Sequence, residues 1–138
     1  MSWDVINPNG QPSGWNDGLL APAGGRVLFV AGQTARDASG KVPNVGFAPQ
    51  FRQVLVNILA VVRAAGAAPA DIGRMTVYVT DINAYRAARK ELAGIWKELM
   101  GTHYPAMALV EVSALMDEHA MLEAEATAVV PPKGGRAG

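Results

Sequence analysis

The sequence predicts an α/β fold, of the α+β kind, in which a single sheet carries two helices on one face. Two segments have apolar residues at three- and four-residue spacing, which is typical of helices with one buried side. Other segments are short and either β-branched or alternating, which is typical of strands. Their order is strand, helix, strand, helix, strand, strand, with one candidate edge strand after the first. This order favours two layers around one core.

The length and composition fit one domain. The chain has 138 residues, of which 50% are hydrophobic and 17% are charged, so it can bury a substantial core. We expect this domain to span residues 1–130. Residues 1–25 are rich in Gly, Pro and Asn and should form a loop-rich segment, and residues 131–138 should fray.

The first half of the chain contains one strand and one helix. The apolar run at residues 26–31 predicts a buried strand, and residues 37–40 predict a turn. Residues 41–43 are a candidate short edge strand, because proline is excluded from central strands. The first helix should end at Gly66. Its apolar stripe consists of Phe47, Phe51, Val54, Leu55, Ile58, Leu59 and Val62.

The second half repeats this pattern and ends in two strands. Residues 74–80 alternate, with Met75, Val77 and Val79 on one face. Asp81 or Asn83 should cap the second helix, which ends at Gly101. The stripe of this helix consists of Tyr85, Ala88, Leu92, Ile95, Trp96 and Leu99. Residues 106–115 and 121–130 are the expected closing strands.

The last strand has two different faces. Ala124, Ala126 and Ala128 share one face, which we assign to the helices because alanine permits close packing. Glu123 and Glu125 share the other face. We expect Glu111 to join them from the neighbouring strand, and the same alternation places four less polar side chains there: Met107, Leu109, Tyr78 and Val129. A half-apolar face with a few carboxylates predicts self-association through the sheet.

Several functional classes are excluded or disfavoured. Twelve basic and twelve acidic residues give zero net charge, which disfavours nucleic-acid binding, and the lack of cysteine excludes thiolate chemistry. No nucleotide-binding motif is present, so we expect no cofactor. His103 and His119 lack metal-ligand spacing and should be loop histidines, so we expect no metal. Without a basic leader or an apolar stretch of about 18 residues, the chain should be cytoplasmic and not membrane-bound.

The candidate chemistry centres on the paired carboxylates. Glu123 and Glu125 suit either a solvated strand face or a polar site in a partly apolar cleft, and the pattern does not decide between the two. Trp96 fits the second helix stripe and should be core. Trp3 and Trp15 lie in the loop-rich segment, where either can cover a pocket.

Six segments at the right order and spacing resemble the RidA/YjgF family, formerly called the L-PSP endoribonuclease family. They lie between residues 19 and 130 and are Val-Ala-Gly-Gln at 30–33, Gln-Val-Leu-Val-Asn-Ile at 53–58, Met-Thr-Val-Tyr-Val-Thr-Asp at 75–81, Tyr-Pro-Ala at 104–106, Val-Glu-Val at 110–112 and Leu-Glu-Ala-Glu-Ala at 122–126. The resemblance implies a chorismate-mutase-like fold and a homotrimer whose sheets line a central barrel. It also implies ligand clefts between subunits and hydrolysis of small enamines or imines to keto acids and ammonia.

The resemblance also implies roles for individual residues. Glu123 matches the carboxylate associated with the attacking water, and Gly32 matches a backbone position beside the ligand. Ala106, Trp15 and Tyr85 are further substrate-binding candidates.

One position departs from the family pattern. The family's Pro-Ala-Arg motif clamps the substrate carboxylate with its arginine, but here Met107 occupies that position, which points to an arginine-lacking subgroup. The sequence does not show which cation, if any, replaces it. The available candidates are Arg26, Arg36, Arg74 and Arg89.

Three functions therefore remain in competition. The first is a deaminase-type hydrolase, with Met107 as an apolar wall. The second is a non-catalytic trimer that binds a small metabolite or a partner protein. The third, a ribonuclease or translation inhibitor, is disfavoured by the neutral charge.

Overall fold

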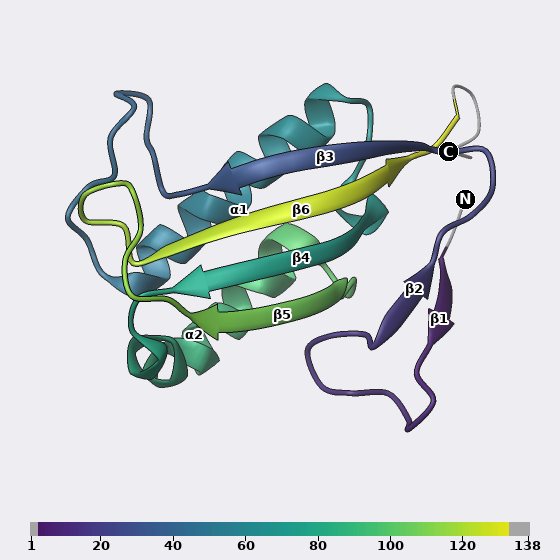
Figure 1. Cartoon of the computed structure of the whole chain (residues 1–138), viewed down its shortest axis with the longest axis horizontal. Helices are drawn as coiled ribbons and strands as arrows, with labels where there is room; N and C mark the ends of the chain where they lie inside the picture. The colour runs from purple at the N-terminus through teal and green to yellow at the C-terminus, as the bar shows by residue number, and fades with distance from the viewer. Residues whose placement is uncertain (1–2, 133–138) are drawn as a thin grey trace.

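A computed structural model describes residues 3–132 as one sheet backed by two helices, with a separate hairpin at one end (Figure 1). The elements in chain order are β1 (Asp4–Ile6), β2 (Gly18–Leu20), β3 (Arg26–Gln33), α1 (Phe47–Ala64), the 3₁₀ turn η1 (Pro69–Asp71), β4 (Ile72–Val79), α2 (Ile82–Met100), β5 (Ala106–Glu111) and β6 (Leu122–Val130). The predicted two-layer fold is confirmed.

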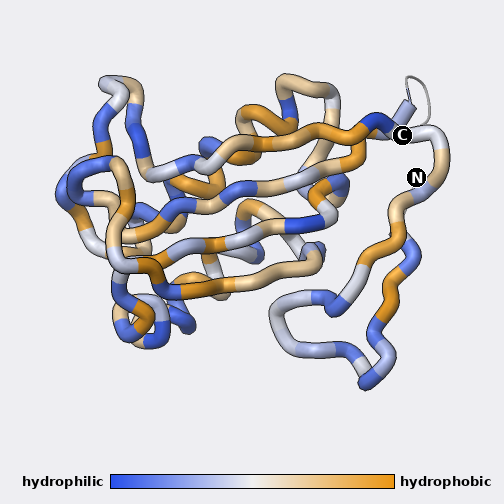
Figure 2. The backbone as a smooth tube through the Cα atoms, in the orientation of Figure 1, coloured by the Kyte–Doolittle hydropathy of each residue, from blue (hydrophilic) through white to orange (hydrophobic). Residues whose placement is uncertain are grey.

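The main sheet is mixed. Its strand order is β3-β6-β4-β5, with β6 antiparallel to both of its neighbours. β4 and β5 are parallel, and α2 forms the crossover connection that two consecutive parallel strands need. Hydrophobic residues make up most of β3 and β5, the two edge strands (Figure 2).

Both helices begin and end where the sequence predicts. Asp81 caps α2, because its carboxylate accepts hydrogen bonds from the N–H groups of Asn83 at 3.0 Å and Ala84 at 3.3 Å. Gly66 and Gly101 follow the two helices with positive φ angles of 84° and 65°, a conformation that glycine adopts without steric cost. Among residues 3–132, no helix is both long and apolar enough to cross a membrane.

The core lies between the helices and one face of the sheet. Ala124, Ala126 and Ala128 are buried there, as predicted, together with Val77 from β4 and Trp96 from α2. Small side chains on the central strand β6 allow the helices to approach closely, so the large residues of α1 fill the layer between them.

Two sequence expectations about elements are wrong, and one was incomplete. The described part of residues 1–25 is loop-rich, and it also contains the antiparallel pair of β1 and β2, which the sequence did not indicate. Residues 41–43 form no strand. They continue the turn in which the Asp37 N–H bonds to the Lys41 carbonyl, and Val42 is buried in the core. The strand expected at 106–115 ends at Glu111, and the expectation for the tail lies largely outside the described residues.

The prediction that Met107, Leu109 and Glu111 lie on the same sheet face as Glu123 is also wrong. Met107 pairs with the buried Met75 and Leu109 pairs with the buried Val77, so both side chains face the helices. Glu111 follows the same alternation and does not join Glu123. Its carboxylate lies at the end of β5 and accepts a hydrogen bond from the Ile82 N–H at 3.0 Å, at the first turn of α2.

Candidate functional site

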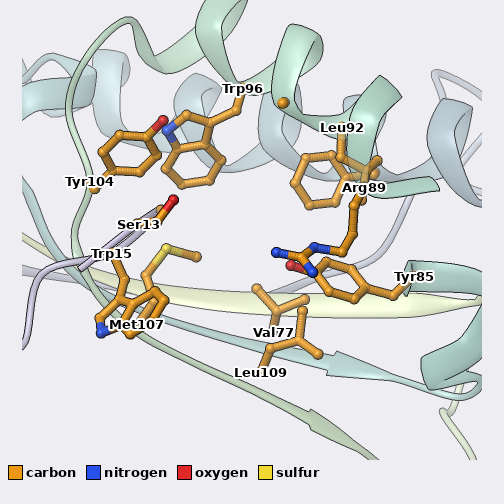
Figure 3. A pocket seen from close by; sticks show the side chains of 13 residues that line it. Ser13, Trp15, Val77, Tyr85, Arg89, Leu92, Trp96, Tyr104, Met107 and Leu109 are labelled. Atoms are coloured by element: carbon orange, nitrogen blue, oxygen red, sulfur yellow. The ribbon is translucent and has the colours of Figure 1, made fainter. Parts of the chain in front are cut away.

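A cavity of about 290 Å³ lies between α2 and the edge of the sheet at β5 (Figure 3). The strands supply its floor and α2 supplies one wall, while the loop between β1 and β2 supplies another. The lining residues are Val77, Met107 and Leu109 from the strands, Tyr85, Arg89, Leu92, Ala93 and Trp96 from α2, Ser13, Gly14 and Trp15 from the loop, and Phe51 and Tyr104. The position and lining are those of a small-molecule pocket.

Aromatic contacts fix the α2 side of the cavity. Trp96 stacks on Tyr104 with ring centroids 5.7 Å apart, and its indole N–H donates to the His103 carbonyl at 3.0 Å. Tyr85 packs edge-on against Phe47, with centroids 6.1 Å apart. These aromatic walls are therefore held in place before any ligand arrives.

A buried asparagine holds the loop wall. The Asn16 side chain donates to the Tyr104 carbonyl at 2.6 Å, and its backbone N–H donates to the Pro105 carbonyl at 3.0 Å. Asn7 and Gln11 donate to its side-chain oxygen at 2.9 and 3.0 Å. The loop is thereby tied to the start of β5, which places the partly exposed Trp15 at the cavity.

Arg89 supplies the positive charge of the cavity. It is the only charged residue in the lining, and its guanidinium extends from α2 into the space between Tyr85 and Leu92 (Figure 3). Met107 lies on the floor at the other end, near Trp15, and offers neither a charge nor a donor. The sequence raised Arg89 as a cation without placing it. Its spacing, four residues after Tyr85 and three before Leu92, is the signal that puts it in the helix stripe facing the sheet.

A second group of predicted residues lies on the opposite, open face of the sheet. There the Glu123 carboxylate lies directly against Gly32, so close that a Cβ at this glycine would overlap it. On the same face, the Tyr78 hydroxyl donates to Glu125 at 3.3 Å. Desolvation and the neighbouring Glu125 and Glu123 carboxylates raise the pKa of Tyr78, so its hydroxyl stays protonated near neutral pH.

The predicted site residues therefore form two sets within one chain. Trp15, Tyr85 and Met107 line the cavity, whereas Gly32 and Glu123 meet on the open face. Ala106 belongs to neither set: it is half-buried, pairs with the exposed Arg74 at the start of β5, and is directed toward the open face.

The remaining candidates have structural roles. A ring nitrogen of His103 lies 2.7 Å from the Ile72 carbonyl, and His119 is in a loop beside Glu118. The described part of the chain holds no cluster of His, Asp and Glu suited to a metal ion. Trp3 covers Gly73 and donates to the Ala70 carbonyl at 2.8 Å, away from the cavity.

Comparison with known proteins identifies the family. The sequence matches the model of the family described as Endoribonuclease L-PSP over residues 15–130. It is 33% identical over 130 residues to a RutC family protein of Haemophilus influenzae, covering 94% of this chain and 98% of that protein. This chain belongs to the RidA/YjgF family.

Two further relatives connect the RidA/YjgF chain to a named activity and to a solved fold. The 2-iminobutanoate/2-iminopropanoate deaminase of Escherichia coli is 35% identical over 106 residues, which is 76% of this chain and 80% of that enzyme. The crystal structure of YyfB from Yersinia pestis, a Rid family protein of unknown function, superposes with a TM-score of 0.78 at 33% identity. That match covers 94% of this chain and all of the other.

Proposed function

We propose that this RidA/YjgF protein hydrolyses a small enamine or imine in a cleft between the subunits of a cytoplasmic homotrimer. The observation that supports the proposal is that the candidate site residues lie on two opposite faces of the sheet. The cavity with Trp15, Tyr85 and Met107 lies on one side of the sheet, and the Glu123–Gly32 pair lies on the other. A cleft that contains both sets needs the cavity of one copy and the open face of another.

The open face supports assembly with further copies. Val27 and Phe29 of β3 and Val110 of β5 are exposed there, with Phe29 80% exposed. Exposed apolar side chains on one continuous sheet face are typical of an interface rather than of a solvated surface.

The reaction requires one water and one group that moves a proton. Glu123 of a neighbouring copy would accept a proton from the water while the oxygen adds to the imine carbon. The nitrogen takes up that proton, which gives a carbinolamine. The same carboxylate would then move the hydroxyl proton to the nitrogen, so that the C–N bond breaks, ammonia leaves and the oxygen remains as the carbonyl of the keto product. The sum is R₂C=NH plus H₂O giving R₂C=O plus NH₃. The apolar cavity would hold the carbon skeleton.

The test uses imines formed in situ by an amino-acid oxidase, with semicarbazide trapping the imine that remains. Wild type should remove the imine faster than buffer does, and Glu123→Gln should lose most of that activity because it keeps the shape but not the base. Glu125→Gln is the matched control and should retain activity. Unchanged turnover in Glu123→Gln would refute the role assigned to this carboxylate.

Met107 favours a second candidate, a trimer that binds a metabolite without turnover. Methionine cannot clamp a carboxylate, so a ligand that raises the melting temperature without being consumed would support this candidate. Met107→Arg, assayed beside wild type, separates the two. Activity gained only in the variant would show an intact scaffold committed to another ligand. The matched family carries the description Endoribonuclease L-PSP, but the neutral net charge still disfavours the ribonuclease alternative.

A further inference from the structure

Arg89 is a positive charge in a cavity that is otherwise uncharged. Its guanidinium has no hydrogen bond or ion pair with any of the described residues. The helix positions that could reach it, three and four residues away on either side, hold Tyr85, Arg86, Leu92 and Ala93. None of these is acidic, so the guanidinium is available to a ligand that enters the cavity.

The guanidinium also has a defined direction. It extends from α2 over the floor residue Val77 and beside Tyr85, while Met107 and Trp15 lie at the far end of the cavity (Figure 3). A ligand that meets Arg89 with a negative group would therefore lay its remaining atoms along the floor toward Met107 and Trp15.

We infer that Arg89 binds the carboxylate of a small monocarboxylic acid whose apolar body fills the rest of this cavity. A planar guanidinium fork matches a carboxylate with two charge-assisted hydrogen bonds. The lining offers no second cation for a dicarboxylate and no carboxylate for an amine. Trp15, Trp96 and Met107 suit an aromatic or branched aliphatic body, and a cavity of about 290 Å³ has room for one.

This inference deepens the proposed function and in part rests on it. If the protein is a deaminase, its substrates are 2-imino acids with large apolar side chains, with the carboxylate held from the helix wall instead of from the strand at position 107. The binding claim itself does not depend on turnover and can be measured separately.

The binding test uses two stable probes of equal shape, 3-phenylpropionate and its neutral amide, 3-phenylpropionamide, titrated calorimetrically into the full chain. Wild type should prefer the acid. Arg89→Gln should weaken binding of the acid by about 10- to 100-fold and leave binding of the amide unchanged, with Arg89→Lys between them. Arg86→Gln is the matched control, because it removes the same charge from the same helix outside the cavity, and it should bind as wild type does.

Two results would overturn the inference. One is equal affinity of wild type for acid and amide. The other is a loss of acid binding in Arg86→Gln as large as that in Arg89→Gln, which would reveal only the general charge of the helix.

Turnover separates this inference from the proposed function. Binding that depends on Arg89 without hydrolysis of the imine of phenylalanine supports the inference and refutes the deaminase. Hydrolysis with the same KM in wild type and Arg89→Gln supports the deaminase and refutes the inference.

Discussion

Gln50 is a residue whose three hydrogen bonds join segments far apart in the sequence. It is buried in α1, donates to the carbonyls of Val45 and His119 at 2.9 Å each, and accepts from the Met121 N–H at 2.9 Å. These contacts fix the loop before α1 to the loop that leads into β6. Neither loop has regular structure at these points, so the side chain replaces the missing backbone ladder.

Gln50→Leu should therefore lower the free energy of unfolding by about 2–4 kcal/mol, because the Val45 and His119 carbonyls and the Met121 N–H, all in part-buried hydrogen bonds, lose this partner. Urea unfolding at a fixed protein concentration measures this. Gln53→Leu, on the same helix, removes one hydrogen bond to Asn57 and should cost less than about 1 kcal/mol. Equal costs for the two variants would contradict the role assigned to Gln50.

Asp117 is a residue whose ionisation should make the stability of the fold depend on pH. Arg36 donates two hydrogen bonds to it, at 2.9 and 3.0 Å, and the Thr34 hydroxyl donates a third. The hydrogen bonds from Arg36 and then from Thr34 hold the pKa of Asp117 below its usual range. The folded state thus has the lower pKa, so the stabilisation is complete above about pH 4 and is lost as the pH falls through the folded-state pKa.

Asp117→Asn should accordingly lower the melting temperature by about 2–4 °C at pH 7, since Arg36 is exposed enough for solvent to screen the pair. The difference from wild type should shrink as the pH falls below about 4. Thermal melts at pH 7, 4 and 3 measure it, and a difference that stays constant to pH 3 would contradict this account.

At the scale of elements, the sequence predicted a helix or a strand face correctly wherever its periodicity has only one physical interpretation. Apolar stripes with Asp81 and the two terminal glycines defined both helices, and the alternation of β6 identified the alanine face. It was insufficient for β5. Met107, Leu109 and Glu111 do share one face, but which face they share depends on the register with β4, which a strand's own sequence does not contain.

The sequence indicated several residues that lie together in the structure, but it did not indicate that they form two sets on opposite faces of the sheet. Trp15, Tyr85 and Met107 do meet at one cavity, and Gly32 does meet Glu123. The placement of Arg89 was not predictable without knowing that the stripe of α2 overhangs the sheet edge, where a long cationic side chain stays accessible while its stem packs against apolar neighbours.

Asn16 holds the loop between β1 and β2 in its position against the start of β5. Asn16→Ala removes the bond to the Tyr104 carbonyl and the acceptor for Asn7 and Gln11, so the loop should loosen and Trp15 should no longer be held at the cavity. We expect faster hydrogen exchange over residues 10–17 and severalfold weaker binding of 3-phenylpropionate. Asn9→Ala, in the same loop and exposed, should change neither quantity. Faster exchange without weaker binding would show that this loop is no part of the site.

At the scale of the whole molecule, the two sets of site residues meet only if copies assemble through the open sheet face, as the proposed function requires. Phe29→Asp places a charge on the edge strand β3 of that face, where burial against another copy would leave it unpaired. Because Phe29 is exposed in the single chain, the variant should keep its fold while losing its oligomeric state, so sedimentation should shift from trimer to monomer. Imine hydrolysis should fall with it, since Glu123 of one copy would no longer reach the cavity of another.

The matched control for this prediction is Val5→Asp, a similar change at an exposed apolar residue of β1, away from the main sheet. It should leave both sedimentation and hydrolysis unchanged. A wild-type protein that sediments as a monomer at micromolar concentration would contradict the divided site at once. If a monomeric Phe29→Asp variant retained full hydrolysis, the whole reaction would take place within one chain. The carboxylate that moves the proton would then have to lie on the helix side of the sheet, where Glu111 is the acidic residue of β5.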